Sequence, residues 1–598
     1  MVDIEDSVQP QATQVARGHH ELVQHLLTLP AAAWDTPAAL RESIWPMCRA
    51  MKIGPPSKRA LGIAYRAALE ADPTLAPNPA FQSAMVHKAV RSASGILNIS
   101  VSLPAGDFSC KYNCHFCPNE PGMPRSYLSN EDVFKRAAQV GFDTVQQVYL
   151  RFMNLATNGH TIDKVEFRVL GGTFSCYDHG VADDFIRDLY YGANTYYEER
   201  GRPRGTIEEE QQKNVTAKVH VVGLGVETRP DEIKPAEIIR FRRYGITRVE
   251  IGVQHTDDAL LRRVNRGHGV KHSRAAVRLL KDYGFKVEMH IMTDLPGATP
   301  EGDKECYRHV LMGNPETGDA DLMPDYLKDY PCLDVDFTKI KEWKAAGIWQ
   351  PYAERTPDAR ELKEVLIYRQ EITPPWVRVN RIQRDFQEAR EGCLGYTSQG
   401  IRSNLAQIVT QEAEARGIYC MCIRCCEVRG QSFDPADIKY EVRSFLASGA
   451  REFFLSATIY TSAHPILLGF LRLRLSEALG SSIIPELTGR TAMIRELHVY
   501  GSLKAVGAGG PNGAQHLGIG RYLLASAERI AVRNGYNKMA VISGIGVRGY
   551  YQKSGYELRG SYMMKPLVHQ IRNDLFIYIV IYYIVAAALA ILWRNYTR

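Results

Sequence analysis

The stretch VEFRVLGGTF, residues 165–174, decides the fold, because a nearly continuous apolar strand runs there into paired glycines. Three further strands are predicted at 219–227, 247–254 and 286–293. Helices are predicted between the strands, at 181–191, 235–243 and 273–283. Apolar strands separated by helices are typical of a parallel sheet that is buried on both faces. We therefore predict an α/β fold around this stretch.

The rest of the chain differs in composition from this region. Residues 1–91 have the pattern of helices and loops, and the polar stretch 197–214 is predicted to be an insertion loop. A connector rich in Cys and Arg precedes a second α/β pattern with different motifs. The predicted segments are therefore 1–91, 92–385, 386–433, 434–567 and a C-terminal tail at 575–593.

Composition limits the class of protein. The chain has 598 residues, of which 45% are hydrophobic and 23% charged, which is ordinary for globular proteins. A net charge of +7 permits an anionic partner such as nucleic acid without requiring one. The twelve cysteines are too sparse for a disulfide scaffold, and seven of them lie in two short windows. Metal chemistry in a reducing compartment is the better interpretation.

The C-terminal stretch is the most apolar part of the chain. Leu575 to Trp593 is an uncharged run of 19 residues, flanked by Arg572, Asp574 and Arg594. Such a run can cross about 30 Å of hydrocarbon as a helix. We predict a C-terminal transmembrane anchor in the mitochondrial outer membrane or the endoplasmic reticulum, with the rest of the chain cytoplasmic. A buried C-terminal helix is the alternative. The N-terminus carries no secretory signal.

Three cysteines with the spacing C-x3-C-x2-C, Cys110, Cys114 and Cys117, indicate the chemistry. Three thiolates suit a 4Fe–4S cluster that leaves one iron open for a ligand. An open iron can hold S-adenosylmethionine and cleave it to a radical, which is reactivity that no side chain has. The alternative is a structural zinc site of the Cys3His type, since His115 lies inside the triplet.

Polar residues follow the predicted strands at the edge where α/β proteins bind ligands. Gly171 and Gly172 end one strand and let a ligand approach the backbone closely. Their place suits a methionine moiety that lies along the strand edge. The residues expected to face a common cavity are Glu227, Arg229, Glu250 and Gln254. The alternative for Glu227 and Arg229 is an ion pair that closes the mouth of the barrel.

The second α/β pattern contains a phosphate-binding signature. QHLGIGR, residues 515–521, fits Q-x-x-G-x-G at the start of a helix, where backbone N–H groups bind a pyrophosphate. It follows the strand-like stretch 495–500 and precedes the pair Tyr550 and Tyr551. The alternative for at least one of these tyrosines is an ordinary place in the core.

A second cysteine cluster lies in the connector. Cys420, Cys422 and Cys425 are candidate zinc ligands, and Cys426 is adjacent to the last of them. The remaining ligands of a closed site are not evident, so zinc and buried free thiols stay open as alternatives. The other cysteines are expected to be ordinary buried residues, namely Cys48, Cys176, Cys306, Cys332 and Cys393.

The order of motifs resembles the Elongator protein three family from about Lys88 to Lys565. After the cysteine triplet the chain reads GGTF, VETRPD, RVEIGVQ, RGH, DLPG, RVNRIQRD, RELHVYGS, QHLGIGRYLL and SGIGVRGYYQKSGYEL. The resemblance implies a TIM-like partial (β/α) radical S-adenosylmethionine (SAM) barrel at 92–385 and a GNAT acetyltransferase domain at 434–567. It also implies that residues 1–91 could contact transfer RNA (tRNA) and that 386–433 could hold zinc.

The resemblance implies an activity and a set of site residues. The family installs a carboxymethyl-type group at carbon 5 of the wobble uridine of tRNA, with acetyl-CoA and a SAM-derived radical. By analogy, the catalytic residues are Lys328, Tyr550 and Tyr551. SAM would contact Gly171, Gly172, Glu227, Arg229, Glu250 and Gln254. Acetyl-CoA would contact Glu496, Leu497, His498, Val499, Gln515, His516, Leu517, Gly518, Ile519, Gly520, Arg521 and Tyr551.

Partners and competing functions complete the expectations. The basic residues expected to hold tRNA phosphates are Lys88, Arg91, Arg229, Arg266 and Lys328. Elongator subunits or further copies of the chain are expected partners. One alternative function is a protein lysine acetyltransferase with a structural cluster, and another is a scaffold with vestigial loops. The chain departs from the family in its short first cysteine gap, in the stretch 332–336 and in its apolar tail.

Overall fold

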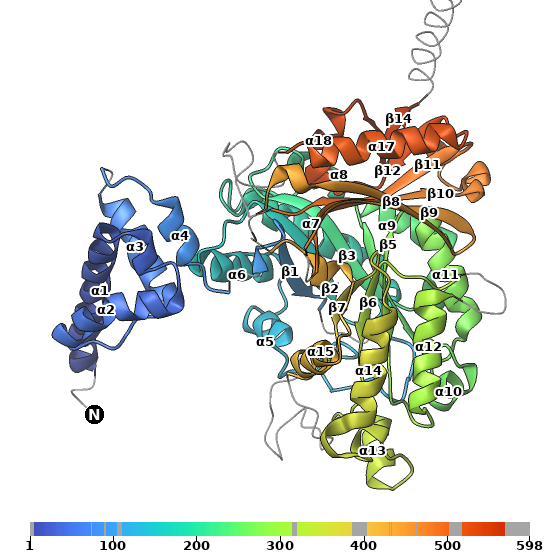
Figure 1. The fold of residues 1–598 in the computed structure, drawn as a ribbon, viewed down its shortest axis with the longest axis horizontal. Helices are drawn as coiled ribbons and strands as arrows, with labels where there is room; N and C mark the ends of the chain where they lie inside the picture. Colours follow the sequence, from blue (N-terminus) through green and yellow to red (C-terminus); the bar gives the residue numbers. More distant parts are fainter. Residues whose placement is uncertain are drawn as a thin grey trace, which may run out of the picture. The chain divides into compact units, whose positions relative to one another are not determined.

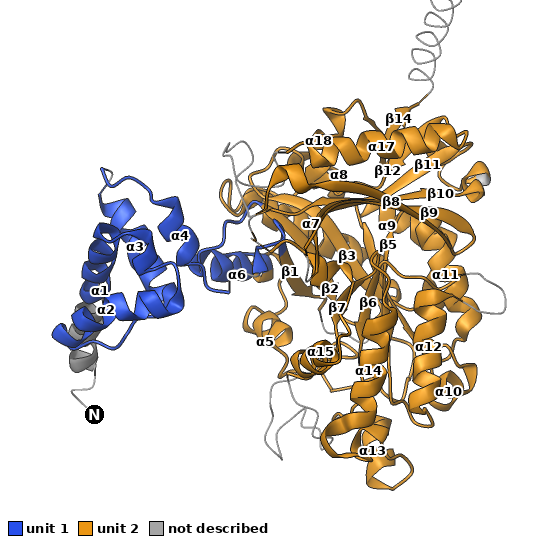
Figure 2. Cartoon of the chain, viewed as in Figure 1, with its two compact units in different colours: residues 1–97, 148–163, 502–508 blue, residues 98–147, 164–501, 509–598 orange. Residues whose placement is uncertain are grey.

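The structure is a computed structural model, and its described residues fall into two compact units. The described residues are 5–72, 74–88, 91–104, 110–313, 320–384, 404–429, 431, 433–461, 464–501 and 517–567. The first unit takes in 1–97, 148–163 and 502–508, and the second holds the rest of the chain (Figure 2). The predicted division into five segments stays a prediction, because these two units combine stretches that are far apart in the sequence and do not test the predicted boundaries.

The first unit is helical, as the pattern of residues 1–91 predicts. Its helices are α1 (Glu5–Thr28), α2 (Pro37–Ala50), α3 (Lys58–Ala71), α4 (Pro79–Ala84) and part of α6 (Thr144–Thr157). Side chains of Thr36, Ser57 and Asn78 accept backbone N–H groups at three helix starts, which satisfies donors that a helix leaves free. Trp34 and Phe81 pack edge to face in its core.

The second unit begins with a seven-stranded sheet whose strands lie in chain order (Figure 1). The strands are β1 (Leu97–Ser102), β2 (Lys164–Leu170), β3 (His220–Thr228), β4 (Arg248–Gln254), β5 (Lys286–Ile291), β6 (Tyr326–Asp329) and β7 (Arg378–Arg381). Neighbouring strands from β2 to β7 are parallel, which confirms the predicted parallel sheet. Since no pairing joins β7 to β1 in the described ranges, the sheet is an open half-barrel.

Helices connect these strands, and three of them overlap the predicted stretches 181–191, 235–243 and 273–283. The connecting helices are α5 (Asp132–Gln139), α7 (His179–Thr195), α8 (Ile207–Asn214), α9 (Pro235–Arg243), α10 (Asp258–Arg263), α11 (Val270–Asp282), α12 (Pro300–Met312), α13 (Lys339–Ala345) and α14 (Arg360–Ile372). Proline at the first position starts α9, where a missing N–H costs nothing, and the Asp178 side chain caps α7. Every residue of β4 is buried, including the polar residues Arg248, Glu250 and Gln254, as expected of a strand that is covered on both faces.

The predicted insertion loop at 197–214 is wrong in its second part. Residues 207–214 form α8, which begins with a capping box between Thr206 and Glu209. Glu210 is fully buried because Arg202 pairs with both of its carboxylate oxygens at 2.6 Å. The stretch is polar because its charges bind one another, so polarity alone misled the prediction.

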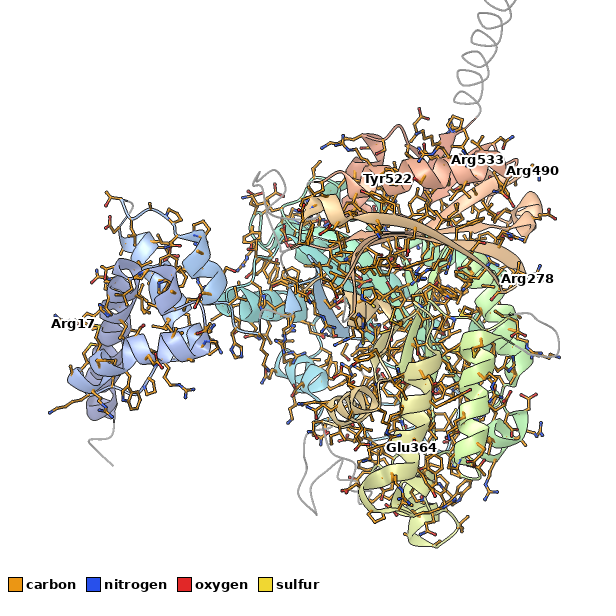
Figure 3. The ribbon with its side chains drawn as sticks, in the orientation of Figure 1. Arg17, Arg278, Glu364, Arg490, Tyr522 and Arg533 are labelled. Carbon is orange, nitrogen blue, oxygen red and sulfur yellow. The ribbon has the colours of Figure 1, made fainter. Side chains whose placement is uncertain are left out.

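A second seven-stranded sheet follows a connector that contains α15 (Leu405–Ala415) and α16 (Ile423–Cys426). Its strands are β8 (Lys439–Ala447), β9 (Ala450–Tyr460), β10 (Pro465–Leu475), β11 (Thr491–Val499), β12 (Lys538–Val541), β13 (Glu557–Arg559) and β14 (Tyr562–Pro566). Its helices are α17 (Ile519–Arg533) and α18 (Arg548–Gln552). The buried residues of α17 pack on this sheet, and Tyr522, near the start of α17 (Figure 3), contacts the ring of Tyr440 with centroids 3.9 Å apart.

Buried ion pairs join the two sheets. Asp325, beside β6, accepts a hydrogen bond of 2.9 Å from Arg495 of β11. Glu452 of β9 accepts from Arg495 at 3.0 Å and from Lys281 of α11 at 3.1 Å. Removal of one partner of such a pair leaves an uncompensated buried charge, which typically costs about 3–5 kcal/mol. These contacts therefore fix the second sheet against the half-barrel.

The predicted fold class needs one correction. The structure describes no helix that is long and apolar enough to cross a membrane. The longest described helix, α1, has 24 residues and is polar over much of its length. The predicted span at 575–593 lies outside the described residues. The described fold is therefore an α/β half-barrel followed by a second α/β sheet, without the predicted transmembrane helix.

Candidate active site

The cysteine triplet lies beside two buried arginines. The sulfur of Cys114 accepts hydrogen bonds from Arg229 at 3.3 Å and from Arg266 at 3.4 Å. Asp231 holds Arg229 through two further contacts of 3.0 Å, and the ring of Tyr112 covers the guanidinium group. Guanidinium donors stabilise a thiolate, which is the form that binds metal. The surroundings of Cys114 therefore suit a metal-bound sulfur.

Cys110 has two polar neighbours on the turn after β2. Its sulfur is 3.5 Å from the Thr173 hydroxyl, and its thiol shares a hydrogen bond with Cys176. The hydrogen bond from Cys176 and that from Thr173 outweigh burial and lower the pKa of Cys110 to about 5. Cys176 was expected to be an ordinary buried residue, but it is half-buried and lies against a predicted ligand.

The spacing of the triplet fits a cluster better than a single zinc ion. Tetrahedral zinc with bonds of 2.3 Å needs sulfurs about 3.8 Å apart. Within the described ranges, Cys110, Cys114 and Cys117 do not form a group whose ligand atoms all lie within 4.8 Å. Cys114 and Cys117 instead line a cavity of about 600 Å³. The ring of His115 packs edge to face on Trp343, with centroids 4.9 Å apart.

Glu227, at the end of β3, organises the glycine turn. One of its oxygens accepts the backbone N–H of Gly171 at 3.1 Å, the N–H of Gly172 at 3.0 Å and the hydroxyl of Tyr127 at 2.6 Å. A Cβ on Gly172, whose φ is +83°, would lie 2.7 Å from the carbonyl oxygen of Arg125. Only glycine fits there, and the carboxylate fixes the turn in this form.

A pocket of about 350 Å³ lies at the carboxyl edge of the half-barrel. Its lining includes Arg168, Glu227, Gln254, His290, Lys328 and Tyr330. Of the four residues expected to face a common cavity, Glu227 and Gln254 line this pocket, whereas Arg229 and Glu250 are not among its lining residues. Gln254 has a φ of +74°, a conformation that L-residues adopt rarely and that is concentrated at ligand sites.

Glu250 lies inside the half-barrel and is occupied by cations. Arg168 donates to it at 2.9 Å, Lys328 contacts its other oxygen, and His290 is 3.1 Å from that same oxygen. Burial raises the pKa of Glu250, but Arg168, Lys328 and His290 outweigh it and hold the pKa well below its usual range. A contact between Glu250 and SAM, as predicted, would have to displace one of these partners.

Lys328 lies between two carboxylates. Its ammonium group contacts Glu250 and lies 3.3 Å from Glu288, which also faces Arg168. Burial and Arg168 lower the pKa of Lys328, but Glu250 and Glu288 outweigh them and raise it. The side chain is therefore a fixed cation. Ligand atoms of Glu250, Glu288 and His290 lie within 4.8 Å of one another, yet the two bound cations make this a poor site for a metal ion.

Three residues expected to hold tRNA phosphates are not at the surface. Arg229, Arg266 and Lys328 are buried, and each is bound to the partners just described. The structure does not support phosphate contacts for them. Lys88 and Arg91, in the first unit, are exposed.

The start of α17 forms the second part of the site. Gly518 caps the helix with a φ of +74°, and a Cβ on Gly520 would lie only 2.7 Å from the hydroxyl of Tyr550. Burial raises the pKa of Tyr550 although Arg521 opposes it, so the hydroxyl keeps its proton at neutral pH. Tyr551 is buried beside it. Leu517 and Ile519 lie at the same helix start, whereas Gln515 and His516 lie outside the described residues.

The predicted acetyl-CoA strand is β11, which runs between β10 and β12. Glu496 pairs with Arg472 of the neighbouring strand β10 at 2.9 Å and contacts the hydroxyl of Tyr326 on β6 of the half-barrel. His498 lies against the ring of Tyr500, with centroids 4.4 Å apart. Leu497 and Val499 pack against the core of the second sheet.

The second cysteine cluster converges in space. Ligand atoms of Cys420, Cys422 and Cys425 all lie within 4.8 Å of one another, and no fourth His, Cys, Asp or Glu of the described chain joins them. Hydrogen bonds from Cys420 and Cys425 hold the pKa of Cys422 well below its usual range. Cys426 faces away and donates to the Met421 carbonyl at 3.4 Å. Three converging thiols, one of them a thiolate, fit a zinc ion.

Sequence reasoning missed several residues of the pocket. Arg168 and His290 lie on strands whose inward side chains are polar at every second position, as in Glu288 and His290 of β5. That period of two indicates a polar interior and could have identified them. Tyr127 and Cys176 carry no local signal, because they reach the site only through the tertiary fold.

Comparison with known proteins identifies the family. Residues 108–310 match the family model described as the Radical SAM superfamily. A tRNA uridine(34) acetyltransferase of Dehalococcoides mccartyi is 36% identical, over 80% of this chain and 99% of that protein. Elongator complex protein 3 of Homo sapiens is 35% identical, over 80% of this chain and 86% of that protein.

A solved structure agrees with these relatives. The archaeal Methanocaldococcus infernus Elp3 with an N-terminal deletion matches 79% of this chain and 99% of its own length. Its sequence identity is 35% and the TM-score is 0.65. Membership of the radical SAM superfamily implies a 4Fe–4S cluster and SAM, and the surroundings of the cysteine triplet fit them. The chain therefore belongs to the Elp3 family of tRNA uridine(34) acetyltransferases, which are radical SAM enzymes.

Proposed function

We propose that this enzyme modifies carbon 5 of the wobble uridine of tRNA, with acetyl-CoA as the donor of the new group. Cys110, Cys114 and Cys117 would hold the 4Fe–4S cluster. When bound, the cluster and SAM supply a radical that can break a C–H bond. One observation carries the proposal: the arginine-lined triplet, the barrel pocket and the helix start at Gly518 belong to the same compact unit.

The residues of the half-barrel would prepare the pocket for SAM and the base. Glu227 holds the turn of Gly171 and Gly172, so that the backbone stays open to a ligand. Lys328 stays protonated and offers a fixed positive charge at the pocket wall. Arg229 would act indirectly, through the cluster ligand Cys114, because it donates a hydrogen bond to that sulfur rather than facing the pocket.

The start of α17 would bind the pyrophosphate of acetyl-CoA. Backbone N–H groups of residues 518–521 have no helical partners there and favour an anion. Tyr550 lies next to this helix start and is 40% exposed, whereas Tyr551 is buried. Tyr550 is therefore the better candidate for the group that donates a proton or a hydrogen bond at the thioester.

Contacts with RNA would come from exposed basic residues of the first unit. Lys88 and Arg91 are exposed and carry the charge that phosphates need. Such binding is independent of sequence and weakens with salt, while a single-stranded loop leaves its bases free to enter a pocket. The name of the eukaryotic relatives, Elongator complex protein 3, supports an assembly with further subunits.

We also propose that Cys420, Cys422 and Cys425 hold a structural zinc ion. Their sulfurs converge within 4.8 Å, as one tetrahedral ion requires. A water molecule or a residue outside the described part would complete the site. Metal analysis of the aerobic protein, in which zinc survives and an iron–sulfur cluster does not, should find about one zinc per chain, and Cys422→Ser should remove it.

Reconstitution tests the proposed activity. The chain is loaded anaerobically with iron and sulfide and incubated with SAM, acetyl-CoA and tRNA, and the products are analysed by mass spectrometry. We expect 5′-deoxyadenosine and a modified wobble uridine from the wild type, and neither from Cys114→Ala. Cys306→Ala, which changes a buried cysteine outside the triplet, is the control. Modified uridine from Cys114→Ala would contradict the proposal, and acetyl-lysine as the only product would favour a protein acetyltransferase.

A further inference from the structure

His290 lines the pocket and lies beside Glu250 and Lys328. It lies on β5, and its side chain keeps 13% of its surface exposed, toward the pocket at the carboxyl edge of the half-barrel. Its ring packs edge to face on Tyr330, with centroids 5.3 Å apart and planes at 87°. Contacts on two sides therefore fix the orientation of the imidazole.

Within the described part of the chain, only one ring nitrogen of His290 has a hydrogen-bond partner. Nε2 lies 3.1 Å from an oxygen of Glu250 and 3.3 Å from the ammonium nitrogen of Lys328. Nδ1 makes no hydrogen bond to any residue that the structure describes. The free nitrogen belongs to a ring that lines the pocket, so a bound molecule is its natural partner.

The neighbours of Nε2 decide where the proton lies. Glu250 is ionised and can only accept, so its contact with Nε2 needs a proton on that nitrogen. Lys328 has two carboxylates, Glu250 and Glu288, as acceptors and does not need the imidazole. A neutral imidazole that donates from Nε2 carries a lone pair on Nδ1. In this neutral form, His290 offers the pocket a hydrogen-bond acceptor.

We propose that His290 selects uracil by accepting a hydrogen bond from the N3–H group of the base at Nδ1. This inference rests on the proposed function and assigns it a specificity residue. Uracil carries a donor at N3, whereas cytosine carries an acceptor there and 3-methyluracil carries a methyl group. Against either of these bases the lone pair of Nδ1 would be left unpaired, and polar sites discriminate strongly against such ligands.

Binding of RNA analogues tests this pairing without catalysis. The full-length chain with SAM is titrated with anticodon stem–loop RNAs that differ at one base and carry uridine, cytidine or 3-methyluridine at the wobble position. Fluorescence anisotropy measures the affinities at one fixed salt concentration, because phosphate contacts contribute equally to the three RNAs. We expect the wild type to bind the uridine RNA at least about tenfold more tightly than either of the others.

Two substitutions separate the nitrogens of His290. The amide of His290→Asn can place an oxygen near the position of Nδ1, so this variant should keep much of the preference for uridine. His290→Gln can restore only the contact to Glu250 and should lose the preference. His309→Gln is the matched control, because His309 is 14% exposed and pairs with an acid, Asp321, at 3.2 Å. This control should discriminate as the wild type does.

Three results would overturn the inference. They are equal binding of the three RNAs by the wild type, an unchanged preference in His290→Gln, and a preference for cytidine, which would place the proton on Nδ1. A preference for uridine that depends on His290, in a chain that modifies no uridine, would support the inference and contradict the proposed function. The two failures are therefore distinguishable.

Discussion

A single carboxylate oxygen of Glu227 holds together the part of the site that is expected to meet SAM. It accepts from two backbone N–H groups, those of Gly171 and Gly172, and from the hydroxyl of Tyr127. Each donor that loses its acceptor in a buried place costs about 1–3 kcal/mol. The position of the turn thus depends on one residue from the neighbouring strand.

Glu227→Ala should weaken SAM binding at least about tenfold, because the glycine turn loses the acceptor that fixes it. Calorimetric titration of the anaerobically reconstituted chain with SAM measures the affinity. Tyr127→Phe, which keeps both backbone contacts to Glu227, should lose much less of its affinity for SAM. If Glu227→Ala binds SAM like the wild type, the turn does not take part in the site.

Individual site residues could be predicted from the sequence only where they belong to a local pattern. Residue type and spacing predicted the cysteine triplet and the glycine turn, because both are local patterns. The partners of Cys114, Arg229 and Arg266, are more than a hundred residues away along the chain, so a surface role for them was a natural but mistaken expectation.

At the scale of elements, the start of α17 depends on a contact that its own sequence does not contain. The Q-x-x-G-x-G pattern predicts a phosphate-binding helix start, and the structure places Gly518 and Gly520 there. The side chain that approaches Gly520 is Tyr550 of α18, thirty residues later. The second glycine is therefore required by the packing of one helix start on another.

Gly520→Ala should displace the hydroxyl of Tyr550, which lies 2.7 Å from the position of the new methyl group. Alanine favours a helix over glycine by up to about 1 kcal/mol, so thermal stability should be kept or improved. We expect slower RNA-dependent use of acetyl-CoA, measured by thiol release, with a melting temperature equal to or above that of the wild type.

Tyr550→Phe supplies the matched comparison. Its rate of acetyl-CoA use should fall by the same factor as that of Gly520→Ala. The double variant Gly520→Ala, Tyr550→Phe should be no slower than either single variant, because both substitutions act through one hydroxyl. Additive losses would mean that Tyr550 and Gly520 act independently.

The positions of strands and helices were easier to predict than the partners of their side chains. The strands β3 and β4 were located from their sequences and were correctly predicted to be parallel, while α8 was missed because its charges are satisfied within the fold. The polar interior of β5 was visible as an alternation of side chains. Which of its residues would meet a cation, a carboxylate or the pocket depends on the neighbouring strands.

On the scale of the whole molecule, buried ion pairs hold the two sheets in one unit. Lys281 of α11 pairs with Glu452 of β9, and burial lowers the pKa of Lys281 to about 8 although Glu452 opposes this. The unfolded chain keeps this proton up to about pH 10.5, so between these values it binds more protons than the folded chain. Stability should therefore rise with pH in this window.

Lys281→Met should remove this pH dependence. The pKa difference corresponds to about 3 kcal/mol across the window from pH 8 to 10.5. Thermal melts of the wild type at pH 7.5, 9 and 10.5 should show a rise that the variant lacks. Lys271→Met, an exposed position on the same helix, should behave as the wild type does. If the melting temperature of Lys281→Met rose with pH as that of the wild type does, another titrating group would be responsible for the rise.

The joining of the two sheets was beyond sequence reasoning. Motifs identified both halves separately, but the pairs Asp325–Arg495 and Lys281–Glu452 connect residues about 170 positions apart. Buried arginines and acids in strands such as β10 and β11 look like surface residues in a sequence. Their burial is a property of the complete chain, which brings the barrel pocket and the helix start of α17 into one unit.

Isotope tracing from acetyl-CoA to the RNA shows whether the carbon added to uridine comes from acetyl-CoA. This transfer requires the half-barrel and the second α/β sheet to act in the same reaction. The reconstituted chain is given SAM, tRNA and acetyl-CoA labelled with carbon-13 in the methyl group, and the wobble nucleoside is analysed by mass spectrometry. We expect the labelled carbon to be attached to carbon 5 of the uridine. Modified uridine without the label, or label found only on protein lysines, would contradict it.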